Sequence, residues 1–395
     1  MSNPAVMGQA PKPELQVLTL TPFYPSEHDD SQGSFVAEPL NALAQSGISS
    51  TVLALQPIYR AKLRPSKKSV PSEWVRYFSL PGNAGLSMAG AFVFARIVGH
   101  IRELVREHRI TMIHAHAALP AGHAAMLLSS ELGLPYVVSV HGLDAFSSVQ
   151  VGGRMGEWCR RISRRVYQGS RRVICVSELV REQVLAGMGT GCRTSVVYNG
   201  VDTDFFSPGS GAGSKELTVL CVGNLIPIKG HEVLIRAIAS IIPEFPSLTL
   251  QVIGDGPDQP RLQALAHQLG ISRTVQFLGR QSRHDVADAL RRCTIFALPS
   301  NYEALGCVYL EAMSAARPVI ACRGQGIAEI ICHGSNGLLV GAGNDKELAL
   351  ALAILLRDEH RRQAMGLAAR DTILERLTLR QQAESLARIY RECAG

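Results

Sequence analysis

Closely paired cysteines are missing from this sequence, because its nine cysteines are scattered and no two form a Cys-x-x-Cys motif. An odd, unclustered set in a chain of 395 residues indicates reduced thiols and argues against a disulfide framework or a zinc site. Apolar runs long enough to span a bilayer are also missing, and residues 1–14 lack the basic start and apolar core of a secretory signal. We therefore expect a soluble protein that works in the cytoplasm.

Charge is scarce as well: charged residues make up 18% of the chain, and the net charge is only +7. A balance this modest gives no reason to expect a nucleic-acid partner. Arginines nevertheless crowd residues 154–172, where Met155, Trp158, Cys159, Ile162 and Val166 recur at helical spacing. We expect an amphipathic helix there with an arginine face. That face is either simply solvated or a peripheral contact with anionic lipid at the inner side of a membrane.

What the sequence does contain is apolar material for two cores, at 46% of the chain, together with many turn residues, 36 glycines and 20 prolines. Short aliphatic runs alternate with amphipathic stretches, a pattern that predicts parallel sheets covered by helices on both faces. In the first half the expected strands are 16–20, 51–55, 112–115, 136–140, 172–176 and 195–198, and the expected helices are 35–46, 89–108, 122–132, 155–168 and 178–188.

A glycine- and serine-rich stretch at residues 207–214 predicts a linker, after which the alternation starts again. The expected strands are then 218–222, 248–253, 275–277, 295–298, 319–321 and 338–340, and the expected helices are 230–242, 259–269, 286–292, 304–315 and 327–332. We predict an N-terminal domain over 1–203, a linker over 204–214, a C-terminal domain over 215–375 and a last helix, 376–395, that packs back on the N-terminal domain.

Two glutamates, Glu303 and Glu311, stand eight positions apart after the strand expected at 295–298. If both lie on one helix, they share a face about 12 Å apart, so that one carboxylate can hold sugar hydroxyls and the other a ribose diol. Gly306 falls where that helix would begin, and free backbone N–H groups of Leu305, Gly306 and Cys307 could face a diphosphate. A plain solvated helix gives the same spacing.

The segment 303–311 resembles the E-x-x-G-x-x-x-x-E motif of the retaining glycosyltransferases of family 4, which have the GT-B fold. Further pieces resemble the family in the expected order: 198–202 (Tyr-Asn-Gly-Val-Asp), 222–225 (Val-Gly-Asn-Leu) with Lys229-Gly230, 253–257, 277–279 and 329–340, which ends in Asn-Gly-Leu-Leu-Val. The resemblance covers nearly the whole chain. It implies two Rossmann-like, doubly wound domains that face each other across a cleft.

The resemblance further implies a UDP- or GDP-sugar donor, a glycan or lipid-linked acceptor, retention of configuration, and a role in cell-envelope or exopolysaccharide synthesis. It implies no metal and no other cofactor. Two other interpretations stay open: a nucleotide-sugar-binding protein without turnover, and a GT-B epimerase or phosphorylase. An NAD-dependent oxidoreductase is disfavoured because the chain lacks G-x-G-x-x-G after its first expected strand.

Lys229 is our candidate for neutralising the diphosphate, because it starts an expected helix after a strand, where the helix N-terminus adds positive potential. Many relatives have an arginine where this chain has Asn224, so a second cation is missing from that turn. We therefore expect backbone amides or another basic residue to share the task, with Asn224 as a binding residue only.

His141 follows an expected buried strand, at the edge where ligands of doubly wound sheets bind. The resemblance implies that His141 contacts the donor across the cleft; a core or capping histidine is the alternative. Asp144 and Gly33 join the predicted binding residues with Asn224, Leu305, Gly306, Cys307 and Glu311, while the predicted catalytic residues are His141, Lys229 and Glu303. His114, His116 and His123 do not have the spacing of a metal site, although the first two would share one face of a strand.

Overall fold

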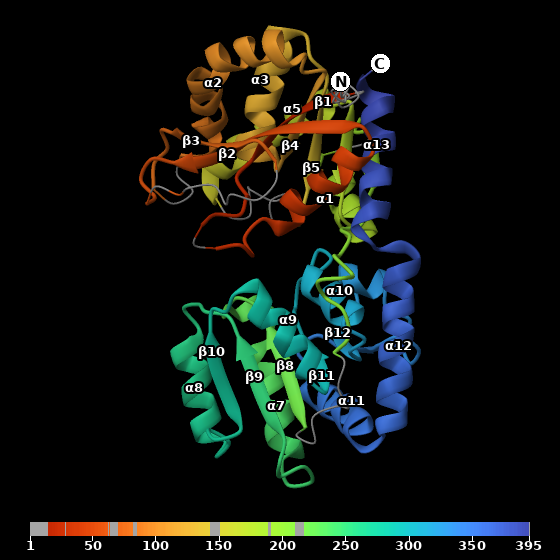
Figure 1. Ribbon diagram of the computed structural model, residues 1–395. Helices are drawn as coiled ribbons and strands as arrows, with labels where there is room; N and C mark the ends of the chain where they lie inside the picture. The colour runs from red at the N-terminus through yellow and green to blue at the C-terminus, as the bar shows by residue number, and fades with distance from the viewer. Residues whose placement is uncertain are drawn as a thin grey trace, which may run out of the picture.

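Two parallel sheets form two lobes, which lie one above the other in Figure 1. The structure is a computed structural model that describes residues 15–27, 29–61, 63, 70–81, 85–142, 151–188, 191–209 and 217–394. Helices cover the faces of both sheets (Figure 1). The predicted architecture, two doubly wound α/β units, is confirmed.

The N-terminal lobe has seven strands: β1 (Leu15–Thr21), β2 (Ile48–Pro57), β3 (Ser72–Tyr77), β4 (Met112–His116), β5 (Tyr136–Val140), β6 (Arg172–Cys175) and β7 (Thr194–Val196). Their order in the sheet is β3-β2-β1-β4-β5-β6-β7. The helices are α1 (Ser34–Gln45), α2 (Leu86–His108), α3 (His123–Leu132), α5 (Gly153–Gly169) and α6 (Glu178–Met188).

Each face of this sheet packs against its own helices because side chains alternate along a strand. In β1, Val17 lies in the cluster that includes residues of α1, whereas Leu18 and Leu20 lie in the cluster that includes residues of α2, α3 and α5. The central strands β4 and β5 are buried along their whole length. The carboxyl ends of these strands are therefore fixed by packing on both sides.

The C-terminal lobe has six strands: β8 (Thr218–Val222), β9 (Thr249–Ile253), β10 (Val275–Gly279), β11 (Ile295–Ala297), β12 (Val319–Cys322) and β13 (Leu338–Val340), in the order β10-β9-β8-β11-β12-β13. Its helices are α7 (His231–Ile241), α8 (Gln259–Gln268), α9 (Arg283–Arg292), α10 (Cys307–Ser314), α11 (Asp345–Arg357) and α12 (Glu359–Arg376).

Every strand expected from the sequence is present, with ends that move by at most three residues. Three local expectations need correction. The edge strand β3 was not expected, because Ser72–Tyr77 mixes polar and apolar residues and is only partly buried. The helix expected at 304–315 begins at Cys307, since Gly306 is left-handed at φ 82° and interrupts it. The helix expected at 327–332 is a short 3-10 turn, Gly326–Glu329.

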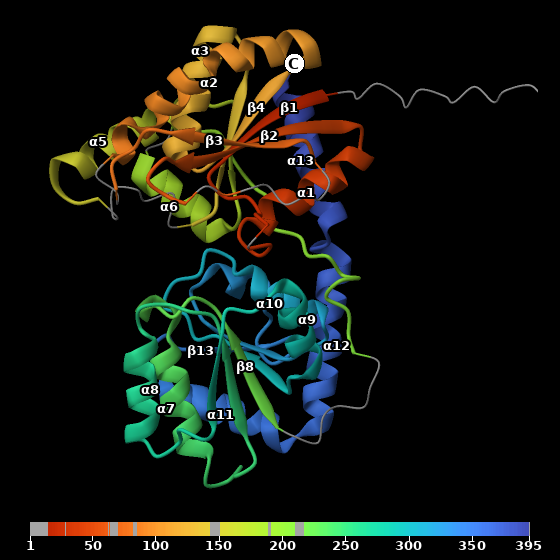
Figure 2. The same ribbon diagram turned by 60° about the vertical axis from the view of Figure 1, so that its left-hand side comes forward.

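The last helix, α13 (Leu379–Ala394), leaves the C-terminal lobe and lies along the N-terminal lobe, where it packs against α1 (Figure 2). Its Tyr390 hydroxyl lies 2.6 Å from His114 Nδ1 of β4. The exact domain limits stay a prediction, and residues 210–216 of the linker region lie outside the described residues. Among the described residues, no helix combines the length and the apolar character that crossing a membrane requires.

Candidate functional site

Lys229 and Glu303 meet in the C-terminal lobe, where the loops after β8 and β11 come together. Lys229 Nζ donates a hydrogen bond to Glu303 Oε2 at 2.6 Å, and the two side chains are only 21% and 13% exposed. Ser300 Oγ donates to the same carboxylate oxygen at 3.3 Å, and the Glu303 backbone N–H donates to Gln325 Oε1 at 2.9 Å. The structure thus brings together two of the three predicted catalytic residues.

Gly230 explains why Lys229 reaches this position. The glycine is left-handed at φ 71°, and a Cβ there would lie 2.0 Å from the carbonyl oxygen of Pro299. No other residue type permits so close an approach of the two loops. The Pro227–Lys229 turn is consequently held against the Pro299 loop, which also carries Ser300 and Glu303.

The acidic pair has a different geometry from the one expected. Glu303 lies in the turn before α10, whereas Glu311 lies in the second turn of that helix, so the two do not share a helix face. A Cβ at Gly306 would lie 2.8 Å from Glu303 Cγ and 2.6 Å from Tyr309 Cδ2, so Gly306 lets the turn fold onto its own helix. Burial raises the pKa of Glu311, and the nearby Arg283 opposes that shift.

The remaining predicted residues of this lobe differ in exposure. Leu305 is buried at 1% exposure, so its side chain packs in the core, and only its backbone can serve a ligand. Cys307 opens α10, and its sulfur accepts a hydrogen bond from Asn199 Nδ2 at 3.2 Å. Burial raises the pKa of the Cys307 thiol to about 12, which keeps it neutral. Asn224 is exposed after β8, and its side chain forms no hydrogen bond within the described part of the chain.

His141 follows β5 in the N-terminal lobe and is held by aromatic rings. Its Nε2 lies 2.9 Å from His116 Nδ1, the two rings are stacked, and the Phe35 ring centroid is 4.7 Å away. Burial lowers the pKa of His141 to about 3, so the ring is neutral at ordinary pH. At the next residue, Gly142, a Cβ would lie 2.7 Å from the Cβ of Ala304, which places the His141 loop against the Glu303 turn of the other lobe.

Gly33 lies at the start of α1 on the same side of the N-terminal lobe. It is left-handed at φ 81°, and a Cβ there would lie 2.5 Å from the backbone of Phe23 and Tyr24. The turn before α1 therefore depends on glycine at this position. Asp144, the remaining predicted residue, lies outside the described residues.

The three histidines considered for a metal site do not converge on one point. His114 and His116 do share one face of β4, with ring centroids 4.3 Å apart, but His114 is bound by Tyr390 and by Ser139 Oγ at 2.7 Å. His123 starts α3 and packs against Gly90 of α2. Within the described ranges, no group of three or more His, Cys, Asp or Glu residues has the geometry of a metal site.

Several contacts between the lobes were not predicted. The carboxylate of Glu329 accepts hydrogen bonds from the backbone N–H groups of Glu178 and Leu179, both at 2.8 Å, and from the Tyr198 hydroxyl at 2.9 Å. A glutamate of one lobe thus caps α6 of the other. The motif segment contains Glu329, but no local pattern reveals a partner some 150 residues away.

Two arginines between the end of β10 and the first residue of α9 form the second set of contacts between the lobes. Arg283 pairs with Glu38 of α1 at 2.5 Å, and Arg280 pairs with Asp29 at 2.5 Å. Burial raises the pKa of Glu38 to about 7, although Arg283 opposes the shift. A hollow of about 550 Å³ between the lobes is lined by residues of both, among them Glu38, Asp202 and Arg283.

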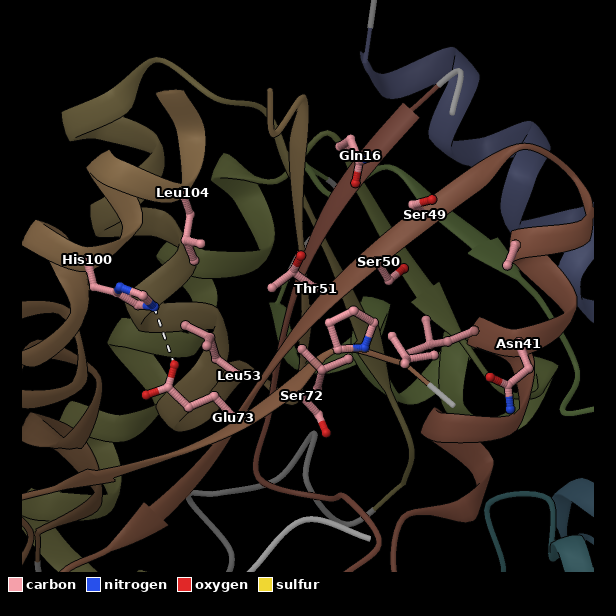
Figure 3. Close-up of a pocket in the computed structure, with 15 residues that line it drawn as sticks. Gln16, Asn41, Ser49, Ser50, Thr51, Leu53, Ser72, Glu73, His100 and Leu104 are labelled. Carbon is pink, nitrogen blue, oxygen red and sulfur yellow. Dashed lines mark ion pairs between the residues drawn. The ribbon is translucent and has the colours of Figure 1, made fainter. Parts of the chain in front are cut away.

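Another hollow, of about 750 Å³, lies within the N-terminal lobe where β1, β2 and β3 begin (Figure 3). Side-chain hydroxyls of Ser49, Ser50 and Thr51 line it, and at one end His100 pairs with Glu73 at 3.3 Å. Ligands of doubly wound sheets bind at the carboxyl ends of the strands. The hollow is at the opposite edge and is therefore separate from the Lys229–Glu303 site.

Sequence comparison matches both lobes to known families. Residues 32–205 match glycosyltransferase family 4, and residues 202–372 match the glycosyl transferases group 1. A D-inositol 3-phosphate glycosyltransferase of Corynebacterium jeikeium is 31% identical over 322 residues, which cover 75% of this chain and 76% of that protein. The chain belongs to glycosyltransferase family 4. It is a glycosyltransferase of the GT-B type, as the motifs predicted.

A second relative and two solved structures agree with this assignment. The GDP-mannose-dependent alpha-(1-6)-phosphatidylinositol monomannoside mannosyltransferase of Mycobacterium tuberculosis is 30% identical over 289 residues, 69% of this chain and 74% of that protein. Anabaena HepE in complex with UDP and glucose has a TM-score of 0.76 at 20% identity, with coverage of 96% and 100%. Sucrose-phosphate synthase of Thermosynechococcus elongatus also has a TM-score of 0.76 at 20% identity, and the match covers 95% of this chain and 98% of that protein. These structures establish the GT-B fold.

Proposed function

We propose that this glycosyltransferase moves a hexose or related sugar from a UDP- or GDP-sugar to a glycan or lipid-linked acceptor, in cell-envelope or exopolysaccharide synthesis. The Lys229–Glu303 pair carries the proposal, since it lies at the start of α10 and next to the contact between Gly142 and Ala304. An ammonium, a carboxylate and open helix-terminal N–H groups at one point suit a diphosphate-linked sugar.

In this proposal the Lys229 ammonium turns from Glu303 to the diphosphate of the bound donor. The first N–H groups of α10 add positive potential to the same phosphates, so Lys229 and the helix together do what a divalent cation does in other transferases. Glu303, released from Lys229, accepts hydrogen bonds from sugar hydroxyls, and Glu311 binds the ribose.

Transfer is proposed to retain the anomeric configuration. The acceptor oxygen bonds to the anomeric carbon from the face that the nucleotide leaves, the bond from that carbon to the phosphate oxygen breaks, and the acceptor proton passes to the departing phosphate. No side chain acts as a separate base. His141 is neutral because its pKa is about 3, so it can hydrogen-bond to the sugar without adding a charge.

The names of similar proteins support both bases in the proposal: the mycobacterial relative is described as GDP-mannose-dependent, and the Anabaena structure contains UDP. That same relative is named for a phosphatidylinositol monomannoside, which supports a lipid-linked acceptor. We also propose a cytoplasmic location, because all nine cysteines are free thiols, as in proteins of a reducing compartment.

Donor turnover tests the proposal. Thermal shifts with UDP, GDP and ADP identify the base, because a ligand stabilises only the fold that binds it. Radiolabelled nucleotide sugars of that base, with EDTA present, should then yield hydrolysed or transferred sugar, and proton NMR of the product should show the donor's anomeric configuration. Binding without turnover would favour the non-catalytic alternative, and loss of turnover in EDTA would contradict the role given to Lys229.

A further inference from the structure

Six large apolar side chains are exposed on one corner of the N-terminal lobe. Phe78 and Leu80 follow β3, Met88 and Phe92 lie on the first turns of α2, and Met155 and Trp158 lie on the first turns of α5. Their exposed fractions run from 36% for Met155 to 52% for Phe78. We call these six residues the apolar corner. Contiguous apolar patches of this kind mark interaction sites in soluble proteins.

Direct contacts join the three elements of the apolar corner. The rings of Phe78 and Phe92 meet edge to face with centroids 5.2 Å apart, and Met88 is one helical turn from Phe92. A Cβ on Gly85, just before α2, would lie 2.7 Å from the Leu80 backbone nitrogen. The sulfur of Met155 lies 3.0 Å from Ser87 Oγ of α2. The six residues therefore form one surface, although they come from three parts of the sequence.

The structure corrects the expected apolar stripe of α5 at this point. Cys159, Ile162 and Val166 are buried as expected, but Met155 and Trp158 are exposed. Figure 2 shows α5 at the outer edge of the upper lobe, on the side away from α13. A tryptophan that is 46% exposed at such an edge contributes little to the core and is available to a partner.

Arginines surround Trp158 on the same helix. Arg154, Trp158, Arg161 and Arg165 follow at intervals of four, three and four residues, so they lie on one stripe of α5. All three arginines of this stripe are exposed. Glu157 is the one acidic residue of the helix, and it pairs with Arg160 at 2.8 Å and Arg161 at 3.4 Å. Arg154 and Arg165 form no ion pair with any of the described residues.

We propose that the apolar corner and the arginine stripe dock the N-terminal lobe on an anionic membrane surface. Aromatic and aliphatic side chains would enter the interface between head groups and acyl chains, while the arginines would contact lipid phosphates. Charge selects this occupant, because the stripe has an unbalanced positive charge around its tryptophan and the head groups of anionic lipids supply the opposite charge. A second copy of the chain would instead bring the same positive charge to the contact. The inference does not depend on the roles of Lys229 and Glu303.

Vesicle co-sedimentation of the full chain tests the proposal. Phosphatidylcholine vesicles that contain phosphatidylglycerol should bind the protein at low salt, and vesicles of phosphatidylcholine alone should bind it at least about tenfold less. Arg161→Glu with Arg165→Glu should weaken binding to the anionic vesicles by about tenfold or more. Phe92→Ser with Trp158→Ser should weaken it similarly, and the loss should persist at every salt concentration.

The matched control is Leu350→Ser with Leu367→Ser, two exposed leucines of the C-terminal lobe at 66% and 59% exposure, which should leave binding unchanged. Nucleotide-induced thermal shifts confirm that each variant is folded. Equal binding to both vesicle types, or corner variants that bind like the wild type, would overturn the proposal. So would a wild-type dimer that the corner variants dissolve while vesicles do not bind, since the surface would then be an interface between copies.

Discussion

The two lobes have the same layout but fix their functional residues in different ways. In the C-terminal lobe close contacts at two glycines position the loops: Gly230 lies against the Pro299 carbonyl, and Gly306 lies against the Glu303 side chain, so the backbone at Lys229 and Glu303 is held in place. In the N-terminal lobe contacts between buried side chains position the functional residues. His141 contacts His116, and His114 contacts both Ser139 and Tyr390. The site in the C-terminal lobe thus depends on glycines that belong to a sequence motif, and the site in the N-terminal lobe depends on contacts that no motif indicates.

The largest effect should follow from removing the ammonium group of Lys229 from the site in the C-terminal lobe. Lys229→Ala should lower kcat by about 100- to 1000-fold, as the loss of one preorganised charge-stabilising group typically does. The matched control is Lys346→Ala, an exposed lysine of α11 in the same lobe, which should keep the wild-type rate. Steady-state assays with the labelled donor measure both. Wild-type turnover by Lys229→Ala would remove the residue from the mechanism.

Two glycines with the same φ of 71°, one from each lobe, should respond differently to alanine. Gly230→Ala should cost about 3 kcal/mol of unfolding free energy, because its Cβ would lie 2.0 Å from the Pro299 oxygen in addition to the left-handed strain. Gly133→Ala, at the end of α3, has nothing within 4 Å of its Cβ and should cost only about 1 kcal/mol. Urea titration measures both. Equal losses would show that backbone contact does not distinguish this site.

The stability of the N-terminal lobe, which contains buried histidines, should fall at acidic pH. Burial lowers the pKa of His114 to about 3, against about 6.5 in the unfolded chain. The unfolded state therefore binds the proton more readily between these values, and stability falls as the pH drops from 6.5 toward 3. The His114→Asn variant cannot take up that proton. The unfolding free energy of the variant should therefore decline less steeply between pH 6.5 and 3, and the difference in slope corresponds to at most one proton bound on unfolding. Denaturant titrations at several pH values would show parallel curves if His114 had no part.

The smallest effect should come from the contact between α13 and the N-terminal sheet. Tyr390→Phe removes the hydroxyl that lies 2.6 Å from His114 Nδ1 and should cost about 1–2 kcal/mol, since it leaves a buried ring nitrogen without its partner. Tyr59→Phe, at 41% exposure in the same lobe, is the control and should be neutral. Thermal unfolding of the two variants compares them. A neutral Tyr390→Phe would mean that the Tyr390 hydroxyl does not help to hold α13 on the N-terminal lobe.

The sequence predicted most of the fold because buried parallel strands and amphipathic helices have strong periodic patterns. It did not predict β3, an edge strand whose mixed polarity gives no pattern, or the start of α10, which depends on the conformation of Gly306. The motifs identified Lys229, Glu303 and Glu311 as candidates but not the ion pair between the first two. The sequence could not predict the cap that Glu329 forms on α6 or the exposure of Trp158, because each depends on how segments far apart in the sequence pack together.

In the proposed mechanism, Lys229 exchanges the Glu303 carboxylate for the diphosphate of the donor. A crystal structure with the nucleoside diphosphate that stabilises the protein tests it most directly. We expect a phosphate oxygen within hydrogen-bond reach of Lys229 Nζ and a distance from Nζ to Glu303 Oε2 longer than the present 2.6 Å. A diphosphate bound elsewhere, with the Lys229–Glu303 pair intact, would contradict it.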